Sequence, residues 1–260
     1  MALRLRPEVS RSGEMTIEQI RYLVANRLRG TPAAYRIARL LYRRWVLPSS
    51  GTRAEAVFRA KLLTNAWGGG ESRSGRGSEA EQTRVLVAAL PQVFRELGVG
   101  SLLDIPCGDF HWMREVDLAG IQYVGADIVP EVVEGNQGFA RDGVRFLRLD
   151  LLHSRLPRAD LVLVRDCLVH LPYGDIFQAL RNLCRSGSTY VLTTTFPNRK
   201  TNSDIRLGAW RPLNLELAPF AFPPPRHLIN EHCPEDAGRY ADKSLGLWRL
   251  SDIKPIARWA

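Results

Sequence analysis

The chain has 260 residues, with a hydrophobic content of 45% and a charged content of 24%, which is typical of one soluble globular domain with a sizeable core. No run reaches the roughly 18 consecutive apolar residues that a membrane helix needs, which argues against a membrane-spanning protein. The formal net charge of +9 favours an anionic partner, without choosing among nucleic acid, a membrane surface and an acidic substrate.

The four cysteines include no Cys-x-x-Cys pair, so neither a zinc knuckle nor a dithiol redox pair is expected. Isolated thiols are typical of a reducing compartment. Residues 1–7 lack the apolar core of a signal peptide. We therefore expect a cytoplasmic protein.

Residues 1–55 are basic and have the spacing of helices. Thr16 and Gln19 resemble a capping box ahead of apolar residues at helical spacing, with Gly30 as a stop. A second helix is predicted over 33–46, where apolar residues alternate with arginines. Such a basic amphipathic helix either rests on a membrane surface or packs on its own domain or a partner.

Residues 67–78 are rich in glycine and serine, which predicts a loop. This loop is either a flexible linker or an ordered segment that offers backbone N–H groups to a ligand, in which case Trp67, Ser74 and Gly75 are site candidates. Ser78 is a candidate N-cap for the helix that follows it.

From residue 99 onward, strands and helices alternate, which indicates a parallel sheet with right-handed crossovers. Apolar runs predict strands at 101–105, 122–127, 145–149, 161–165 and 190–194. Helical spacing predicts helices at 111–116, 130–139 and 176–184, and Gly187 is expected to end the last of these. Two late runs, 227–230 and 244–250, complete a doubly wound, mostly parallel sheet of seven strands as a hairpin-like pair.

Acidic residues end the first two strands. Asp104 precedes a tight Pro106-Cys107-Gly108 turn, and Asp127 ends the second strand about twenty residues later. A carboxylate in that second position suits ribose hydroxyls. The two acids together indicate a cofactor that contains a nucleoside.

These residues resemble the class I S-adenosylmethionine-dependent methyltransferases. The family's first-strand signature is matched at Asp104 and Gly108, whereas Pro106 and Phe110 replace two of its glycines. Segments 123–128, 146–151 and 159–172 resemble its second, third and fourth strands in the right order. The motifs at 104–110 and 242–248 further resemble those of a bacterial subgroup of methyltransferase-like proteins whose substrate is not established.

The resemblance implies a Rossmann-like methyltransferase domain over 56–260, with a substrate-side insertion at 197–243 and a basic helical extension at 1–55. The implied cofactor is S-adenosyl-L-methionine, with S-adenosyl-L-homocysteine as the product. Asp104 or Asp109 would hold the methionyl ammonium, and Asp127 the ribose. The full set of expected cofactor residues is Trp67, Ser74, Gly75, Asp104, Pro106, Cys107, Gly108, Asp109, Asp127, Ile128, Asp150, Leu151 and Arg165.

A dinucleotide enzyme is the main competitor for this cofactor pattern. It would need Gly-x-Gly-x-x-Gly to bring a helix N-terminus against pyrophosphate. Pro106, Asp109 and Phe110 occupy that turn instead, and the charge of Asp109 would repel pyrophosphate.

The end of the fourth strand faces the transferred methyl group in this family. There, His170 is a candidate general base, and Asp166 lies four residues away, on the same side of a helical turn, where it would orient His170 or the substrate. Alternatively, His170 only packs beside Leu171, and His111 is a second candidate base. No acidic pair has metal-ligand spacing, so no metal is expected.

The insertion offers Trp210, Arg211, Asn214 and Tyr240 as candidate acceptor-binding residues. We expect O-methylation of a hydroxyl on a small molecule or a glycan. Nucleic-acid methylation, which the basic N-terminal zone favours, and a non-catalytic module that binds S-adenosylmethionine remain alternatives.

Overall fold

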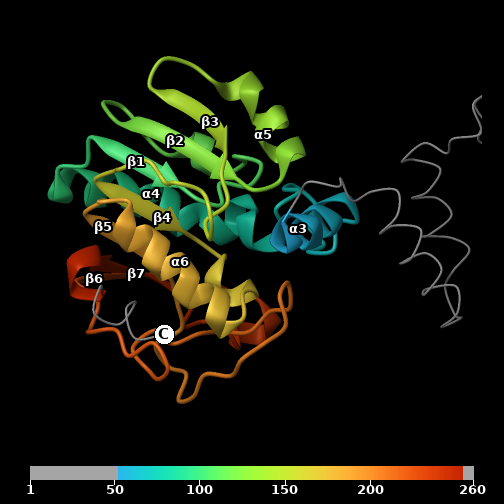
Figure 1. The fold of residues 1–260 in the computed structure, drawn as a ribbon, viewed down its shortest axis with the longest axis vertical. Coiled ribbons are helices and arrows are strands. Elements are labelled where there is room, and N and C mark those ends of the chain that lie inside the picture. The colour runs from blue at the N-terminus through green and yellow to red at the C-terminus, as the bar shows by residue number, and fades with distance from the viewer. Residues whose placement is uncertain (1–51, 254–260) are drawn as a thin grey trace, which may run out of the picture. The chain divides into compact units, whose positions relative to one another are not determined.

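A computed structural model describes residues 52–253. Its centre is a seven-stranded sheet in the order β3-β2-β1-β4-β5-β7-β6 (Figure 1). Strands β1 to β5 run parallel, and β7 is antiparallel to both of its neighbours. The strands are β1 (Ser101–Asp104), β2 (Gln122–Asp127), β3 (Val144–Arg148), β4 (Leu161–Val164), β5 (Tyr190–Thr195), β6 (His227–Asn230) and β7 (Ser244–Arg249). The predicted doubly wound, Rossmann-like α/β fold is confirmed.

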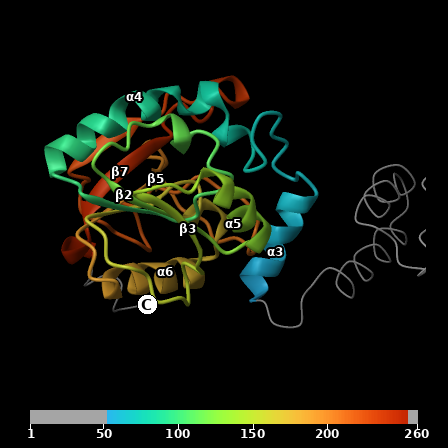
Figure 2. The same ribbon diagram turned by 90° about the horizontal axis from the view of Figure 1, so that it is seen from above.

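Side chains alternate between the two faces of the sheet, and each face carries its own apolar core. Leu102, Tyr123 and Leu161 pack beneath the helix α4 (Ala80–Leu97). Their neighbours Leu103 and Val162 point to the opposite face, where α6 (Tyr173–Arg185) packs. Figure 2 shows α4 above the sheet and α6 below it. Both faces of the parallel strands are therefore buried, which explains their continuous apolar runs.

The helices depart from the predictions at their ends. α6 begins at Tyr173 rather than 176, and Gly187, at a φ of 76°, follows its C-cap as expected. α5 (Pro130–Asn136) continues as a 3-10 turn to Phe139, whereas the predicted helix 111–116 shrinks to a 3-10 turn at Met113–Glu115.

The prediction that Ser78 caps α4 is wrong. Ser78 ends a short 3-10 turn, and Glu79 takes the N-cap position without a side-chain bond of its own to the helix. The first amide of the helix, at Ala80, instead donates to the Glu71 carboxylate at 3.0 Å. A carboxylate there also suits the positive end of the helix dipole.

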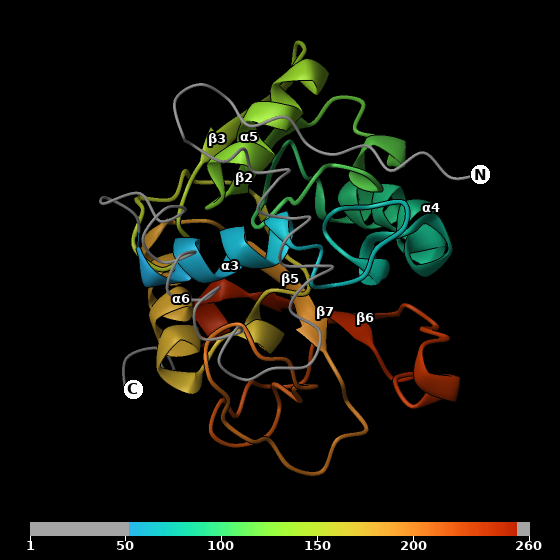
Figure 3. The same cartoon turned by 90° about the vertical axis from the view of Figure 1, so that its right-hand side faces the viewer.

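Helix α3 (Arg53–Leu63) precedes the sheet domain and runs through the boundary predicted at residue 55. The helices predicted at 16–30 and 33–46, with their membrane or packing alternatives, lie outside the described residues. Figure 3 shows α3 across the front of the fold, and its Ala54, Phe58 and Leu62 share a cavity with residues at the carboxyl ends of the strands. Within residues 52–253, no helix has the length and apolarity needed to cross a membrane.

The structure explains why the motif at 242–248 contains Asp242, Gly246 and Trp248. A Cβ on Gly246 would lie 2.3 Å from the Trp248 indole, so only glycine lets that ring fold back over its own strand. The buried indole N–H donates to the carbonyl oxygen of Pro223 at 2.7 Å, and Asp242 pairs with Arg199 at 2.8 Å. The motif thus fastens the 197–243 insertion to the edge of the sheet.

Candidate functional site

A cavity of about 410 Å³ opens at the carboxyl ends of the central strands. From β1 the chain moves outward through β2 and β3, then returns to the other side of β1 to form β4. The strand order reverses at this point, and side chains cannot close the gap between the two diverging crossovers. A volume of this size is suited to a ligand of small-molecule dimensions.

Three carboxylates from successive strand ends line the cavity: Asp104, Asp127 and Asp150. Asp104 accepts a hydrogen bond from the Tyr123 hydroxyl at 2.8 Å. Asp127 accepts from the Val129 amide at 2.9 Å and the Gly108 amide at 3.3 Å. The structure therefore brings together acids that lie up to 46 residues apart in the sequence.

Burial makes two of these acids hard to ionise. Desolvation raises the pKa of Asp104 to about 7, against the lowering effects of the Tyr123 hydroxyl and the Arg165 charge. Desolvation also raises the pKa of Asp127 to about 6, against three backbone N–H groups. Their carboxylates would be stabilised by a ligand that brings a cation or hydroxyl donors into the cavity.

The turn after β1 lines the cavity through Pro106, Cys107 and Gly108. Its amides are already used within the protein, because that of Cys107 donates to the Ala126 carbonyl at 2.8 Å and that of Gly108 to Asp127. Both N–H groups thus have acceptors within the protein. The same wall carries apolar side chains, namely Ile128, Val129, Val132, Leu149 and Leu151.

The glycine-rich loop 67–78, called the strap below, is ordered against this turn. Trp67, Ser74 and Gly75 all line the cavity, as an ordered loop requires. Asp109 faces the strap: its carboxylate accepts hydrogen bonds from Ser72, Arg73 and Ser74. Asp109 does not line the cavity, so it is not placed to bind an ammonium there, and Asp104 is the acid of this turn that is.

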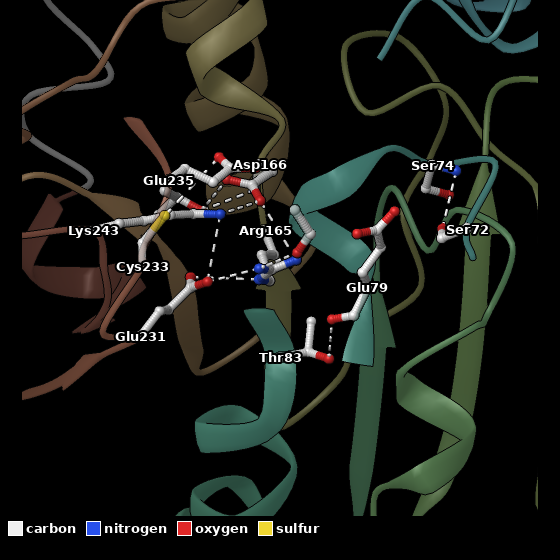
Figure 4. Close-up of polar contacts among 12 residues, drawn as sticks. Ser72, Ser74, Glu79, Thr83, Arg165, Asp166, Glu231, Cys233, Glu235 and Lys243 are labelled. Carbon is white, nitrogen blue, oxygen red and sulfur yellow. Dashed lines mark hydrogen bonds and ion pairs between the residues drawn. The ribbon is translucent and has the colours of Figure 1, made fainter. Parts of the chain in front are cut away.

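A buried ion cluster closes the cavity beyond β4 (Figure 4). Glu231 pairs with Arg165 at 2.6 Å and with Lys243 at 3.4 Å, and Lys243 pairs with Asp166 at 2.6 Å. Burial alone would raise the pKa of Asp166, but the Lys243 and Arg165 charges outweigh it and hold the pKa at about 2. The pKa of Lys243 is raised: burial lowers it, but its two acidic partners more than offset burial and the Arg165 charge.

Lys243 and Glu231 had no predicted role, although Lys243 belongs to the 242–248 motif. Glu231 directly follows β6 and Lys243 directly precedes β7, while Arg165 and Asp166 directly follow β4. The sequence signal that could have identified these two residues is their position at strand ends. The carboxyl ends of β4 and β6 and the start of the antiparallel β7 lie at the same edge of the sheet. The partners lie 66 and 77 residues apart, so no local pattern joins them.

His170 lines the cavity between two aromatic rings, at centroid distances of 6.4 Å from Phe58 and 6.0 Å from Trp67. Its Nδ1 lies 2.9 Å from the Ala209 carbonyl oxygen. Desolvation lowers its pKa, although the Ala209 carbonyl and the Asp166 charge oppose this. Within residues 52–253, no hydrogen bond joins His170 to Asp166, so the expected orienting pair does not form: Asp166 is held by Lys243, and Ala209 orients His170.

His111 is placed away from the cavity, with Nε2 3.5 Å from the Glu71 carboxylate. The 3-10 turn that replaces the predicted helix leaves it beside the start of α4. It is therefore not in position to act as the base.

The four candidate acceptor residues separate into two pairs. Trp210 and Tyr240 line the cavity and meet edge to face at 4.8 Å. Arg211 and Asn214 are buried elsewhere. Arg211 donates to the carbonyls of Leu168 and Leu171, and Asn214 to those of Pro197 and Arg199. These two residues hold the insertion together and do not reach an acceptor.

In the described part of the chain, no group of three or more His, Cys, Asp or Glu side chains is arranged to hold a metal ion.

No family model matches the chain, and no curated protein does. Several solved structures have a similar chain trace. One is the PH0226 protein of Pyrococcus horikoshii OT3, with 18% sequence identity and a TM-score of 0.46; the match covers 66% of this chain and 92% of that one. Human N-acetylserotonin methyltransferase in complex with SAM has 18% identity over 70% of this chain and 53% of that one, at 0.44. The methyltransferase domain of bacterial CtHen1-C has 16% identity over 45% and 66%, at 0.39. The chain thus matches less than two thirds of the length of these last two structures. Likenesses of this size do not identify a reaction.

Proposed function

We propose that this protein is an S-adenosylmethionine-dependent methyltransferase that acts on a hydroxyl group of a small molecule or a glycan. The observation that carries the proposal is the meeting of Asp104, Asp127 and Asp150 around one cavity at the point where the strand order reverses. The order of motifs along the sequence, with its resemblance to class I methyltransferases, supports the same cofactor.

The residues present fit this cofactor. Asp104 would bind the methionyl ammonium, and Asp127 the ribose hydroxyls, so that each of these desolvated acids would gain a further donor from the ligand. Leu151 lies in the apolar wall, and its amide donates to no acceptor within the described chain; it would serve the adenine ring beside Asp150. When bound, the cofactor supplies an electrophilic methyl group on a sulfonium.

His170 is the proposed general base. A carbonyl oxygen only accepts hydrogen bonds, so Nδ1 must carry the proton that is donated to Ala209. Nε2 then holds a lone pair, and the lowered pKa keeps the ring neutral near pH 7. Through Nε2, His170 would accept the proton of an acceptor hydroxyl.

Trp210 and Tyr240 are the proposed binding surface for the acceptor. With Phe196 they form an aromatic corner, with centroids 4.8–6.2 Å apart, in the cavity wall. Trp210 remains 41% exposed, so part of its ring is open to a ligand. Aromatic faces of this kind bind the apolar faces of rings, in phenols and in sugars alike.

Calorimetric titration with S-adenosylhomocysteine tests the cofactor. Binding should be detectable and should weaken by roughly 1–3 kcal/mol in Asp127→Ala, because the ribose hydroxyls lose a charged partner. Asp117→Ala is the matched control, since Asp117 is exposed and caps a turn away from the cavity. Absence of binding at millimolar ligand would refute both the enzyme and the cofactor-binding module.

A methyl-transfer assay with panels of phenols, saccharides and RNA then tests the acceptor. Formation of S-adenosylhomocysteine with a phenol or a saccharide, and its loss in Trp210→Ala, is the expected result. Turnover of RNA alone, with binding that weakens steeply as salt rises, would instead favour the nucleic-acid alternative.

A further inference from the structure

The strap, residues 67–78, spans the cavity from the β1 side to the β4 side. At one end it is bound by Asp109, which follows the β1 turn. At the other end the Gly77 carbonyl accepts a hydrogen bond from the Arg165 guanidinium at 2.7 Å. Residues 74–78, which include the stretch between these anchors, form part of the cavity wall. Figure 4 shows Ser72 and Ser74 at the right of the view, away from the ion cluster of Arg165 at the left.

The Asp109 carboxylate makes the densest set of contacts with the strap. It accepts hydrogen bonds from the Ser72 hydroxyl at 2.8 Å, the Arg73 amide at 2.7 Å and the Ser74 hydroxyl at 3.1 Å. The Asp109 amide in turn donates to the Ser74 hydroxyl at 3.0 Å. Hydrogen bonds to an ionised acceptor are about twice as strong as neutral ones, so this one side chain is a strong anchor.

Gly108 permits this close approach. A Cβ at this position would lie 2.2 Å from the Ser74 hydroxyl oxygen. The two residues that follow Cys107 in the first-strand motif therefore both serve the strap. This also gives a reason for an acid at 109, which the family resemblance offered only as a second candidate, after Asp104, for binding the methionyl ammonium.

The strap needs such an anchor because of its composition. Five of its twelve residues are glycine, and glycine loses more conformational freedom on ordering than any other residue. Its Arg73 and Arg76 side chains are exposed, whereas Ser72 and Gly75 are buried. Other contacts hold the rest of the strap, among them the Gly70 amide on Glu79 and the Gly77 carbonyl on Arg165, each at 2.7 Å. Asp109 is the side chain from outside the strap that holds residues 72–74.

We infer that Asp109 is a positioning residue for cofactor binding: it holds Ser74 and Gly75 in place as a wall of the cofactor end of the cavity, without contacting the cofactor itself. The inference rests on the proposed function for the identity of the ligand. The anchoring itself does not depend on that identity, so the two are tested separately.

Limited trypsin digestion with mass-spectrometric mapping tests the anchoring. In Asp109→Ala, cleavage after Arg73 and Arg76 should become about tenfold faster, because losing an anchor worth about 1.4 kcal/mol raises the open population by that factor. Cleavage elsewhere between residues 80 and 253 should keep its wild-type rate, which a general loss of stability would not allow. Asp117→Ala should behave like the wild type.

Titration with S-adenosylhomocysteine tests the consequence for the site. Asp109→Ala should bind it about tenfold more weakly. Asp109→Asn should lie in between, because its amide oxygen can still accept from the Arg73 amide while its NH2 group donates to a serine hydroxyl. Ser72→Ala removes a hydroxyl that donates to Asp109 and accepts from the Ser74 amide. It should shift both measurements in the same direction, even if Asp109→Ala fails to fold.

The outcomes separate the two proposals. Unchanged cleavage after Arg73 and Arg76 in both Asp109→Ala and Ser72→Ala would overturn the anchoring. Faster cleavage with unchanged affinity would overturn the link between the strap and the cofactor, while leaving the proposed function intact. A wild-type protein that does not bind S-adenosylhomocysteine would refute the proposed function, whatever the digestion shows.

Discussion

Asp104 combines a buried carboxyl group with a hydroxyl donor and no direct ion-pair partner in residues 52–253. Its pKa in the folded protein, about 7, lies above its ordinary value of 3.8. The folded state therefore binds a proton more tightly than the unfolded state does. This contribution to stability is complete below pH 3.8 and is lost as the pH rises through 7.

Substituting Asp104→Asn should remove this pH dependence. The free energy of unfolding of the wild type, measured relative to the variant by urea titration, should fall on the order of 3 kcal/mol between pH 4 and pH 7.5. Asp117→Asn, at an exposed turn, is the control and should follow the wild type. A difference between wild type and Asp104→Asn that stays constant with pH would show that Asp104 is not desolvated.

His170 should govern the acidic limb of the activity profile. Because its pKa is lowered from 6.5, the proposed base should stay active as the pH falls, and kcat/KM should decline only below pH 6.5. His170→Gln should lower kcat by roughly 100-fold or more, with little change in affinity for S-adenosylhomocysteine. His111→Gln is the control; loss of activity there, with His170→Gln active, would reverse the assignment.

At the level of single residues, the location of a side chain was predicted best near the ends of strands. Asp104, Asp127, Asp150 and His170 all reach the cavity that their positions implied. It was predicted least well where a polar residue could serve either a ligand or the backbone. Arg211 and Asn214 have the chemistry of a sugar site, but both satisfy buried carbonyl groups of the insertion, and those partners are irregular segments with no periodic signal.

Among the secondary-structure elements, the ion cluster ties β4 to the β6–β7 edge across the intervening β5. Glu231 is the member with the most buried side chain, 1% exposed, and it faces two cations, Arg165 and Lys243. Removing its charge leaves Asp166 as the one acidic partner of these two cations within the cluster. In a buried network the loss of one partner costs more than the pair contributes, because the remaining charges stay desolvated.

Glu231→Gln should therefore lower the free energy of unfolding by roughly 3–5 kcal/mol, as measured by urea titration at pH 7. Asp252→Asn breaks the exposed pair with Arg226 at 3.2 Å and should change stability little, which makes it the matched control. Equal effects of the two substitutions would mean that water reaches the cluster.

Elements were predicted well where apolar runs are continuous and less well where short segments take their shape from tertiary contacts. β2 and β6 match their predicted bounds, and the other strands differ by one residue at an end or, for β3, by a shift of one residue. The segment at 111–116 is only a 3-10 turn because Trp112 and Met113 enter the core under α4, which fixes their backbone from outside. The predicted Ser78 cap does not form, because Glu71, in the strap, supplies the acceptor for the first amide of α4 instead.

In the molecule as a whole, the cavity belongs to the folded state alone, since it is assembled from α3, the strap, the carboxyl ends of β1 to β5 and the insertion. A ligand that binds there stabilises the entire domain by mass action. S-adenosylhomocysteine at 100 times its dissociation constant should raise the free energy of unfolding by about 2.7 kcal/mol. Differential scanning fluorimetry should show the melting temperature rising with ligand concentration, and Asp127→Ala should need more ligand for the same rise.

The doubly wound architecture followed from the alternation of strands and helices, including the late antiparallel pair. What the chain order did not reveal is how the sheet is covered at its carboxyl edge. The strap and the insertion are irregular, and long-range partners such as Asp109 for 72–74 and Asp242 for Arg199 set their paths. Such contacts carry no short-range pattern.

The internal bracing of the insertion has a consequence for specificity. Arg211 and Asn214 fix its course from within, while Trp210 and Tyr240 alone among the four candidates face the cavity. Under the proposed function, framework and recognition surface would be carried by different side chains. Exchanging the two aromatic residues would then alter the choice of acceptor without disturbing the scaffold that displays them.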